Sequence, residues 1–180
     1  MDLALPEPES LATIVYTSGS TGQPKGVMHN FAAMISVAAG LQENFNASNE
    51  DRMLSYLPLA HVAERAAVET LSLYFGFSIF FSEGLETFQK DLQRAQPTIF
   101  FSVPRLWTKF YLGVNEKLPL EKQKRLFRIP ILSGIVKRKI LKQLGLDKCR
   151  MAVTASAPLP PNIIQWYRKL GLEVLDVYGM

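Results

Sequence analysis

Cysteine is scarce in this chain, and the usual signals of secretion and membrane insertion are missing. Cys149 is the only cysteine among 180 residues, so no internal disulfide can form. No apolar run is long enough to cross a bilayer as a helix. The first ten residues are acidic and contain Pro6 and Pro8, so they have neither the basic start nor the apolar stretch of a secretory signal. We therefore expect a cytoplasmic protein, in which a lone thiol stays reduced.

The composition is that of a folded domain, and the order of patterns predicts its class. Hydrophobic residues make up 48% of the chain, which is too many for a disordered segment. Residues 1–10 are a polar lead-in that we expect to be disordered or a cut end, and 11–180 can form one domain. Strand patterns alternate with helix patterns, which predicts an α/β fold with a largely parallel sheet flanked by helices. Strands are expected at 11–16, 53–56, 77–81, 98–102, 150–154 and 173–177, and helices at 30–45, 60–75, 86–95, from 103 onward, in two pieces within 117–146, and at 160–170.

The sequence contains neither the P-loop motif G-x-x-x-x-G-K-S/T nor the dinucleotide-binding motif G-x-G-x-x-G. Residues 17–26 nevertheless have a phosphate-binding composition. Pro24 and Gly26 stand where a P-loop would have its second glycine and its Ser or Thr. The ten residues nevertheless include four hydroxyl side chains, three glycines and Lys25. Glycines let backbone N–H groups approach a polyphosphate, hydroxyls donate further hydrogen bonds, and a lysine neutralises charge. A loop of similar composition in arbitrary order would be typical of a flexible connection.

The order of residues from Tyr16 to Gly26 is Y-T-S-G-S-T-G-Q-P-K-G. It closely resembles the signature of the adenylate-forming superfamily, which includes acyl-CoA synthetases, luciferases and the adenylation domains of peptide synthetases. The resemblance implies that the loop holds the β- and γ-phosphates of ATP and that Lys25 clamps their charge. The implied phosphate-binding residues are Thr17, Ser18, Gly19, Ser20, Thr21, Gly22 and Lys25.

A second motif, Y-L-P-L-A-H-V-A-E-R, begins at Tyr56 and contains His61. A histidine beside apolar residues is otherwise typical of a satisfied position in a core or at a helix start. In this order the segment is similar to the L-P-x-x-H of the superfamily, and its form looks most like that of long-chain fatty acyl-CoA synthetases. The resemblance implies that His61 lies at the acyl and acyl-adenylate site, a catalytic residue alongside Lys25, with Glu64 as a weaker candidate.

A segment of small residues follows the strand expected at 150–154. The carboxyl end of a strand in an open parallel sheet is where ligands bind. The segment, T-A-S-A-P-L, is similar to the S-G-x-A-P-L that borders adenine in the superfamily, with Ala155 in place of the glycine. The implied adenine contacts are Ser156, Ala157 and Pro158. Without the resemblance, a small-residue turn before a helix would be the simpler interpretation.

The last residues, D-V-Y-G-M, match the start of the superfamily motif Y-G-x-T-E. The match implies that Tyr178 stacks on adenine and that Gly179 lies beside the nucleotide. The threonine and the Mg²⁺-binding glutamate of the motif would follow Met180, so we assign no metal ligand. A ribose-binding aspartate, a hinge and a C-terminal lid also have no match, and we interpret the chain as a fragment of the N-terminal ATP- and acyl-binding domain.

These resemblances imply a fragment of a long-chain fatty acid–CoA ligase. Such a ligase activates a fatty acid with ATP to an acyl-adenylate and transfers the acyl group to coenzyme A. ATP, Mg²⁺ and coenzyme A are the implied cofactors, a fatty acid is the implied substrate, and the fragment alone is expected to be inactive. The alternatives are a catalytically inactive nucleotide- or acyl-binding or scaffold module, and another superfamily branch such as an aryl-CoA or fatty acyl-AMP ligase.

Positive charge is concentrated in one segment. Residues 117–150 contain eleven Lys and Arg against Glu121 and Asp147, a local charge of +9, whereas the whole chain carries +4 and the remainder therefore −5. Within that segment, 122–142 interleaves basic and aliphatic residues, as in helices that lie on anionic lipid. Peripheral membrane contact through 122–142 and a solvated helical face both fit this pattern. Nucleic acid is not an expected partner, because few aromatic residues accompany the basic ones.

Overall fold

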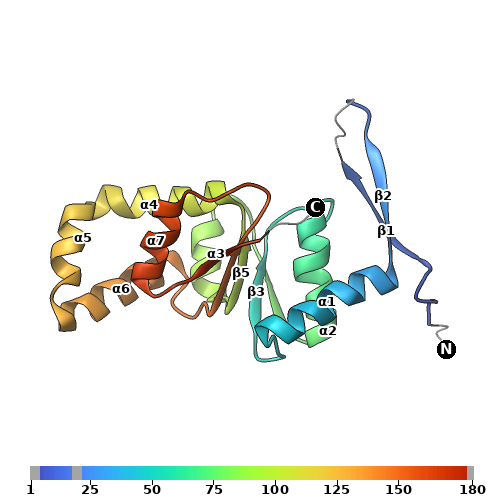
Figure 1. The fold of residues 1–180 in the computed structure, drawn as a ribbon, viewed down its shortest axis with the longest axis horizontal. Coiled ribbons are helices and arrows are strands. Elements are labelled where there is room, and N and C mark those ends of the chain that lie inside the picture. The colour runs from blue at the N-terminus through green and yellow to red at the C-terminus, as the bar shows by residue number, and fades with distance from the viewer. Residues whose placement is uncertain (1–4, 18–21, 178–180) are drawn as a thin grey trace. The chain divides into compact units, whose positions relative to one another are not determined.

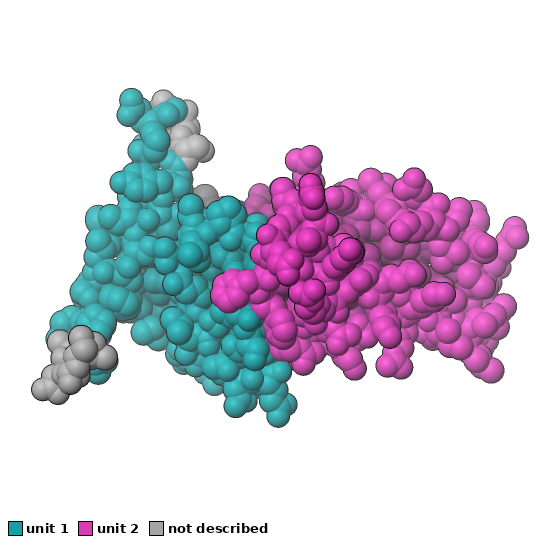
Figure 2. Space-filling view, turned by 180° about the vertical axis from the view of Figure 1, so that it is seen from behind, with its two compact units in different colours: residues 1–51, 55–79 teal, residues 52–54, 80–180 magenta. Residues whose placement is uncertain are grey.

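The structure, a computed structural model, describes residues 5–17 and 22–177. The chain divides into two compact units (Figure 2). Unit 1 is residues 1–51 with 55–79, and unit 2 is residues 52–54 with 80–180. The strands β3 (Arg52–Ser55) and β4 (Ser78–Phe81) form a two-stranded sheet, and the division between the units passes through both strands.

Unit 1 begins with a β-hairpin (Figure 1). β1 (Leu11–Thr17) pairs antiparallel with β2 (Lys25–Asn30). Val15 is 7% exposed, whereas Ile14 and Tyr16 are 45% and 69% exposed. The strand expected at 11–16 is present, but it pairs antiparallel rather than parallel, and Val15 is its one buried residue. The two strands are joined by a short loop, which suits antiparallel pairing, because parallel neighbours need a crossover of a dozen or more residues.

A helix follows the hairpin directly, and residues at its start hold Pro8 and Glu9 by hydrogen bonds. α1 (Phe31–Phe45) begins after Asn30, whose side-chain oxygen accepts a hydrogen bond from the Ala33 N–H at 2.8 Å. The Ala32 N–H donates to the Pro8 carbonyl at 2.9 Å, and Asn30 Nδ2 donates to Glu9 Oε2 at 2.7 Å. The described part of 1–10 is thus hydrogen-bonded to the start of α1, which corrects the expected disorder.

The helix expected at 60–75 is present, but most of it is not α-helical. η1 (Glu64–Thr70) is a π-helix, and α2 (Leu71–Phe75) continues it to Gly76. Gly76 has a φ of 74° and caps α2 in the left-handed conformation. Short π-helical turns are rare and often lie at functional sites, and this one begins at Glu64, within the His61 motif.

Unit 2 is built on a three-stranded parallel sheet. Its strand order is β5 (Ile99–Ser102), β6 (Met151–Thr154) and β7 (Val174–Asp176). The strands pair in register, and each lies within a residue of the position that its apolar run predicts. The α/β class is confirmed, although the parallel part of the described sheets is limited to these three strands.

Five helices belong to the described part of unit 2. They are α3 (Phe88–Ala95), α4 (Pro104–Lys117), α5 (Leu120–Phe127), α6 (Pro130–Leu144) and α7 (Pro161–Leu170). Figure 1 shows α4 and α6 joined at one end by the short α5. The two helical pieces expected within 117–146 are present as α5 and α6, and Pro130 begins the second of them. α7 packs against both α4 and α6.

Aromatic side chains form the centre of unit 2. Trp107 and Tyr167 are 0% exposed, and their rings meet edge to face with centroids 5.0 Å apart. The Phe100 and Trp107 rings also meet edge to face, with centroids 5.4 Å apart. The Tyr167 hydroxyl donates to the Trp107 carbonyl at 2.9 Å, and burial raises the pKa of this hydroxyl, so it stays a donor. Such aromatic pairs add to the free energy gained by burial alone.

A buried glutamine holds α5, and a close backbone contact holds the end of α6, to the rest of unit 2. Gln123 of α5 is 1% exposed, and its Nε2 donates to the Leu118 carbonyl at 2.7 Å while its Oε1 accepts from Trp166 Nε1 at 2.8 Å. At the end of α6, Gly145 has a φ of +77°, and a Cβ there would come within 2.7 Å of the Leu92 backbone. α5 is therefore held to α7, and α6 ends in close backbone contact with α3.

Candidate functional site

The end of the hairpin carries the lysine of the phosphate motif. Thr17 and Lys25 are cross-strand partners, and the Thr17 hydroxyl donates to the Lys25 carbonyl at 3.5 Å. Lys25 is exposed and belongs to β2 rather than to the loop. It makes no ion pair within the described residues, so its charge is available to an anion. Gly22 has a φ of +77°, a conformation that favours glycine, and the predicted Ser18, Gly19, Ser20 and Thr21 lie outside the described residues.

The structure explains why a glycine occupies position 26. A Cβ on this residue would come within 2.9 Å of Ile14 Cγ2 and 3.5 Å of the Tyr16 ring. The side chains of β1 therefore cover the backbone of Gly26, and a larger residue would push them away. The glycine after Lys25 thus keeps the two strands paired close to the loop.

His61 lies in a compact hydrogen-bonded turn at the end of its motif. The His61 N–H donates to the Pro58 carbonyl at 2.8 Å, and the Ala63 N–H donates to His61 Nδ1 at 3.1 Å. Because Nδ1 accepts a hydrogen bond, the neutral imidazole carries its proton on Nε2. The side chain is exposed, so Nε2 can donate to a ligand oxygen.

Glu64 is a positioning residue of this turn rather than a ligand-facing one. It is 2% exposed, and its carboxylate accepts hydrogen bonds from the Ser55 hydroxyl and, at 3.3 Å, from the Leu57 N–H. These bonds tie the first turn of η1 to the end of β3 and to the start of the L-P-L-A-H segment. The motif indicated that Glu64 mattered, but only the structure shows that its carboxylate points inward.

The carboxyl edge of the parallel sheet carries a row of polar side chains. Ser102, Thr154 and Asp176 end the three strands and are partners in register. Thr154 is 0% exposed, and its hydroxyl has no hydrogen-bond partner among the described residues. A fully buried hydroxyl without a partner is costly, so this edge suits a ligand that supplies one. The superfamily motifs assign no role to Asp176.

The loop after β6 is held by Asp176. Its carboxylate accepts a hydrogen bond from the Leu159 N–H at 3.1 Å, and Ser156 has a φ of 78°, which is uncommon for a residue other than glycine. The predicted contacts Ser156, Ala157 and Pro158 are all exposed at the sheet edge. The glycine that the superfamily has at Ala155 is not required here for a positive φ, since that conformation falls on the next residue. Tyr178 and Gly179 lie outside the described residues.

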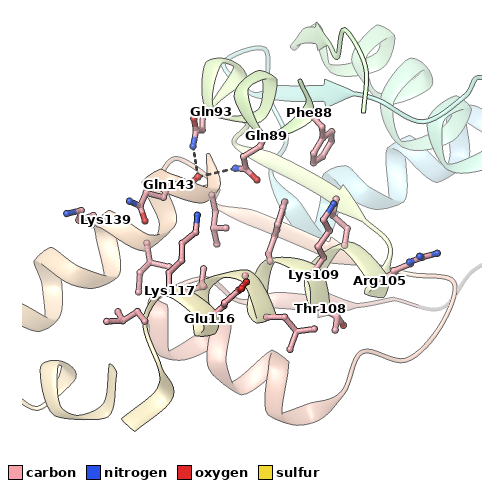
Figure 3. Close-up of a pocket in the computed structure, with 18 of the residues that line it drawn as sticks. Phe88, Gln89, Gln93, Arg105, Thr108, Lys109, Glu116, Lys117, Lys139 and Gln143 are labelled. Atoms are coloured by element: carbon pink, nitrogen blue, oxygen red, sulfur yellow. Dashed lines mark hydrogen bonds between the residues drawn. The ribbon is translucent and has the colours of Figure 1, made fainter. Parts of the chain in front are cut away.

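An open cleft of about 1650 Å³ lies between α3, α4 and α6 (Figure 3). Apolar side chains line its walls, and Lys109, Lys117 and Lys139 stand among them. Gln89 and Gln93 donate to the Gln143 carbonyl at 3.0 Å and 2.6 Å, which links α3 to α6 beside the cleft. Of the site residues that the sequence motifs predict, none within 5–17 and 22–177 lines it.

Three further properties of the described residues concern metal binding, membrane spanning and thiol reactivity. Within 5–17 and 22–177, no group of three or more His, Cys, Asp or Glu side chains is placed to hold a metal ion. None of the helices in those ranges combines the length and apolarity needed to span a membrane. Burial raises the pKa of the Cys149 thiol to about 12, so this thiol is neutral and poorly reactive near neutral pH.

Comparison with known proteins agrees with the motifs. Residues 2–180 match the family model described as AMP-binding enzyme. Fatty acyl-CoA synthetase A of Dictyostelium discoideum is 38% identical over 98% of this chain, and peroxisomal long chain acyl-CoA synthetase 6 of Arabidopsis thaliana is 34% identical over 97%. The chain spans 29% and 28% of the lengths of these two relatives.

Solved structures share the fold. The adenylation and carrier didomain of a carboxylic acid reductase from Segniliparus rugosus, in complex with AMP, gives a TM-score of 0.74 at 30% identity, over 99% of this chain and 26% of that one. ATP-bound MatB from Rhodopseudomonas palustris gives 0.68 at 24% identity, over 97% of this chain and 30% of that one. The fold is that of adenylate-forming enzyme domains. The chain belongs to the AMP-binding enzyme family, which confirms the resemblance carried by its loop and histidine motifs.

Proposed function

We propose that this chain provides ATP- and acyl-binding residues of a long-chain fatty acid–CoA ligase. The relatives named as fatty acyl-CoA or long chain acyl-CoA synthetases support this assignment, as does the L-P-L-A-H-V-A-E-R form of the histidine motif. The reaction has two steps. The carboxylate of the acid attacks the α-phosphate of ATP and releases pyrophosphate, and the thiol of coenzyme A then displaces AMP from the acyl-adenylate.

The observation that carries the proposal is the hairpin end, where exposed Lys25 stands opposite Thr17. Two anions must approach each other in the first step, so the protein must position them and offset the charge that develops at phosphorus. Lys25 holds the distal phosphates and the loop supplies hydrogen-bond donors. Mg²⁺, when bound, would neutralise further phosphate charge.

On the acyl side, His61 acts as a hydrogen-bond donor through Nε2. Its Nδ1 is occupied by the Ala63 N–H, and buried Glu64 holds the turn in place, so the imidazole keeps one tautomer and one orientation. On the adenine side, the exposed loop Ser156–Pro158 and the unpartnered Thr154 hydroxyl fit a purine at the sheet edge.

The test is fatty-acid-dependent ATP–pyrophosphate exchange, followed by assay of the CoA thioester. Two proteins are compared: the 180-residue chain, and a longer protein that includes this chain and has the length of its relatives. Each is assayed with a short, a long and an aromatic acid. Exchange by the longer protein alone, fastest with the long acid and followed by thioester formation, is the expected result. No exchange by either would favour a nucleotide- or acyl-binding or scaffold module.

Lys25→Ala tests the phosphate role in the same protein. Removing a charged hydrogen-bond partner should weaken ATP binding by about tenfold or more. Lys90→Ala is the matched control, because Lys90 is an exposed lysine of α3 that no motif includes. Equal ATP affinity in the Lys25 variant and the wild type would remove the phosphate role.

A second candidate is a branch that forms the acyl-adenylate but passes it to another acceptor. The 30% identity to the didomain of a carboxylic acid reductase supports this second candidate. Exchange without any CoA thioester would select this alternative, and exchange that is fastest with the aromatic acid would select an aryl-CoA branch.

A further inference from the structure

The outer face of α6 combines exposed aliphatic and basic side chains. Ile131, Ile135, Arg138 and Lys142 follow one another at spacings of four, three and four residues, so they form one stripe along the helix. Ile131 and Ile135 are 79% and 59% exposed, and Arg138 and Lys142 are also exposed. The stripe is apolar in the first half of the helix and basic in the second. We call these four residues the α6 stripe.

The opposite face of α6 is buried, which fixes the direction of the stripe. Ile140 and Leu144 are 5% and 6% exposed and pack into unit 2. The helices α5 and α6 are both anchored. Gly145, at the end of α6, contacts α3, and Gln123 of α5 is hydrogen-bonded to Leu118 and Trp166. The stripe is therefore a preformed surface feature that requires no refolding to reach a partner.

The segment that contains the α6 stripe is strongly basic. Residues 122–146 contain eight Lys and Arg and no Asp or Glu. Lys124 pairs with Glu121 at 2.7 Å, and the Lys137 ammonium lies 5.2 Å from the centre of the Phe127 ring. In the described part of the chain, no ion pair involves Arg138 or Lys142. The two basic residues of the stripe can therefore meet an external anion.

We propose that the α6 stripe docks the protein on an anionic lipid surface. Ile131 and Ile135 enter the boundary between headgroups and acyl chains, while Arg138 and Lys142 contact the lipid phosphates. A nucleic acid would also satisfy the two cations, but it would leave the exposed isoleucines in water and would favour aromatic side chains instead. The docking goes beyond the proposed ligase activity and does not depend on it.

Vesicle co-sedimentation of the 180-residue chain tests the proposal. The vesicles are phosphatidylcholine alone, or phosphatidylcholine with roughly one third phosphatidylglycerol, a composition that supplies the anionic surface. Binding to the anionic vesicles only, weakened by added salt, is expected. Arg138→Gln with Lys142→Gln should lower the partition coefficient by about thirtyfold, and Ile131→Ser with Ile135→Ser by about tenfold or more. No binding of the wild-type chain to anionic vesicles would overturn the proposal.

A matched control removes two lysines elsewhere in unit 2. Lys90→Gln with Lys169→Gln changes the net charge equally at exposed positions of α3 and α7, and should leave vesicle binding within about twofold. An equal loss in this control and in the stripe variant would show that net charge alone is responsible, and would overturn the proposal. The proposal would also be overturned if the Ile131 and Ile135 variant still bound vesicles and the chain bound a duplex oligonucleotide as tightly as it binds vesicles. Circular dichroism of each variant checks that the fold is kept.

A labelled variant reports insertion directly. Cys149 is partly buried and its thiol has a raised pKa, so it reacts poorly, and Ile131→Cys can carry a polarity-sensitive fluorophore as the chain's one modified thiol. A blue shift on anionic vesicles is expected. Leu73→Cys, at an exposed position of α2 in unit 1, is the control and should show none. A shift of equal size at Leu73, or none at Ile131, would contradict docking through α6.

Discussion

Unit 1 and unit 2 use aromatic and aliphatic residues in different ways. In unit 1, the hairpin that carries the phosphate motif leaves Ile14, Tyr16 and Met28 largely exposed. In unit 2, Trp107 and Tyr167 are completely buried and meet edge to face. The comparison teaches that the most informative motif lies where little is packed, whereas the segments with weak motifs hold the core. The described side chains of the hairpin therefore contribute little to packing, whereas the aromatic cluster of unit 2 is fully packed.

The strongest test of this contrast is Trp107→Ala in unit 2. The change opens a cavity beside Phe100 and Tyr167, and it should lower the free energy of unfolding by about 4 kcal/mol. Urea unfolding followed by circular dichroism measures the loss. A change below about 1 kcal/mol would mean that the aromatic cluster is not central to stability.

A second test concerns the contact between α6 and α3. Gly145→Ala should cost about 3 kcal/mol, because the residue has a φ of +77° and its Cβ would lie 2.7 Å from the Leu92 backbone. Gly171→Ala is the control: it has a φ of +95° with nothing within 4 Å, so it should cost only about 1 kcal/mol. Equal costs in urea unfolding would show that backbone conformation alone, and not close packing, requires Gly145.

A gain of stability is expected at Gly113, in the middle of α4. A Cβ there meets nothing within 4 Å, so Gly113→Ala should stabilise the chain by about 0.7 kcal/mol through helix propensity. The midpoint of urea unfolding should rise with an unchanged slope. A lower midpoint would indicate that the open wall of the cleft is occupied by other atoms in solution.

The smallest effect is expected in the hairpin. Tyr16 is 69% exposed, so Tyr16→Ser should change the free energy of unfolding by less than about 0.5 kcal/mol. Measured beside Trp107→Ala, it compares one exposed and one buried aromatic residue in the two units. A loss of several kcal/mol would show that the hairpin belongs to a core after all, and would remove the contrast between the units.

Much of unit 2 could be predicted from the sequence for a physical reason. Its three parallel strands are short apolar runs bounded by proline, glycine or polar residues, and Pro104, Pro130 and Pro161 each stand in the first turn of a helix. These signals are local, so they need no knowledge of tertiary contacts. The family, too, could be recognised from two contiguous motifs.

The errors and omissions depend on contacts that a local sequence pattern does not show. The run at 11–16 is as apolar as a buried strand, and only its antiparallel pairing with 25–30 shows that most of it is exposed. Glu64 looked like a possible site residue because its inward hydrogen bonds to Ser55 and Leu57 are not visible in the motif. The burial of Gln123 likewise follows from Trp166, which is 43 residues away in sequence.

The distribution of tryptophan makes the chain an optical reporter of one half of itself. Both tryptophans, Trp107 and Trp166, are buried in unit 2, and unit 1 contains none. Intrinsic tryptophan emission therefore follows unit 2 alone, while far-ultraviolet circular dichroism follows the helices and strands of both units. Recording the two signals during a single denaturation distinguishes one cooperative transition from two independent ones, without any added dye or label.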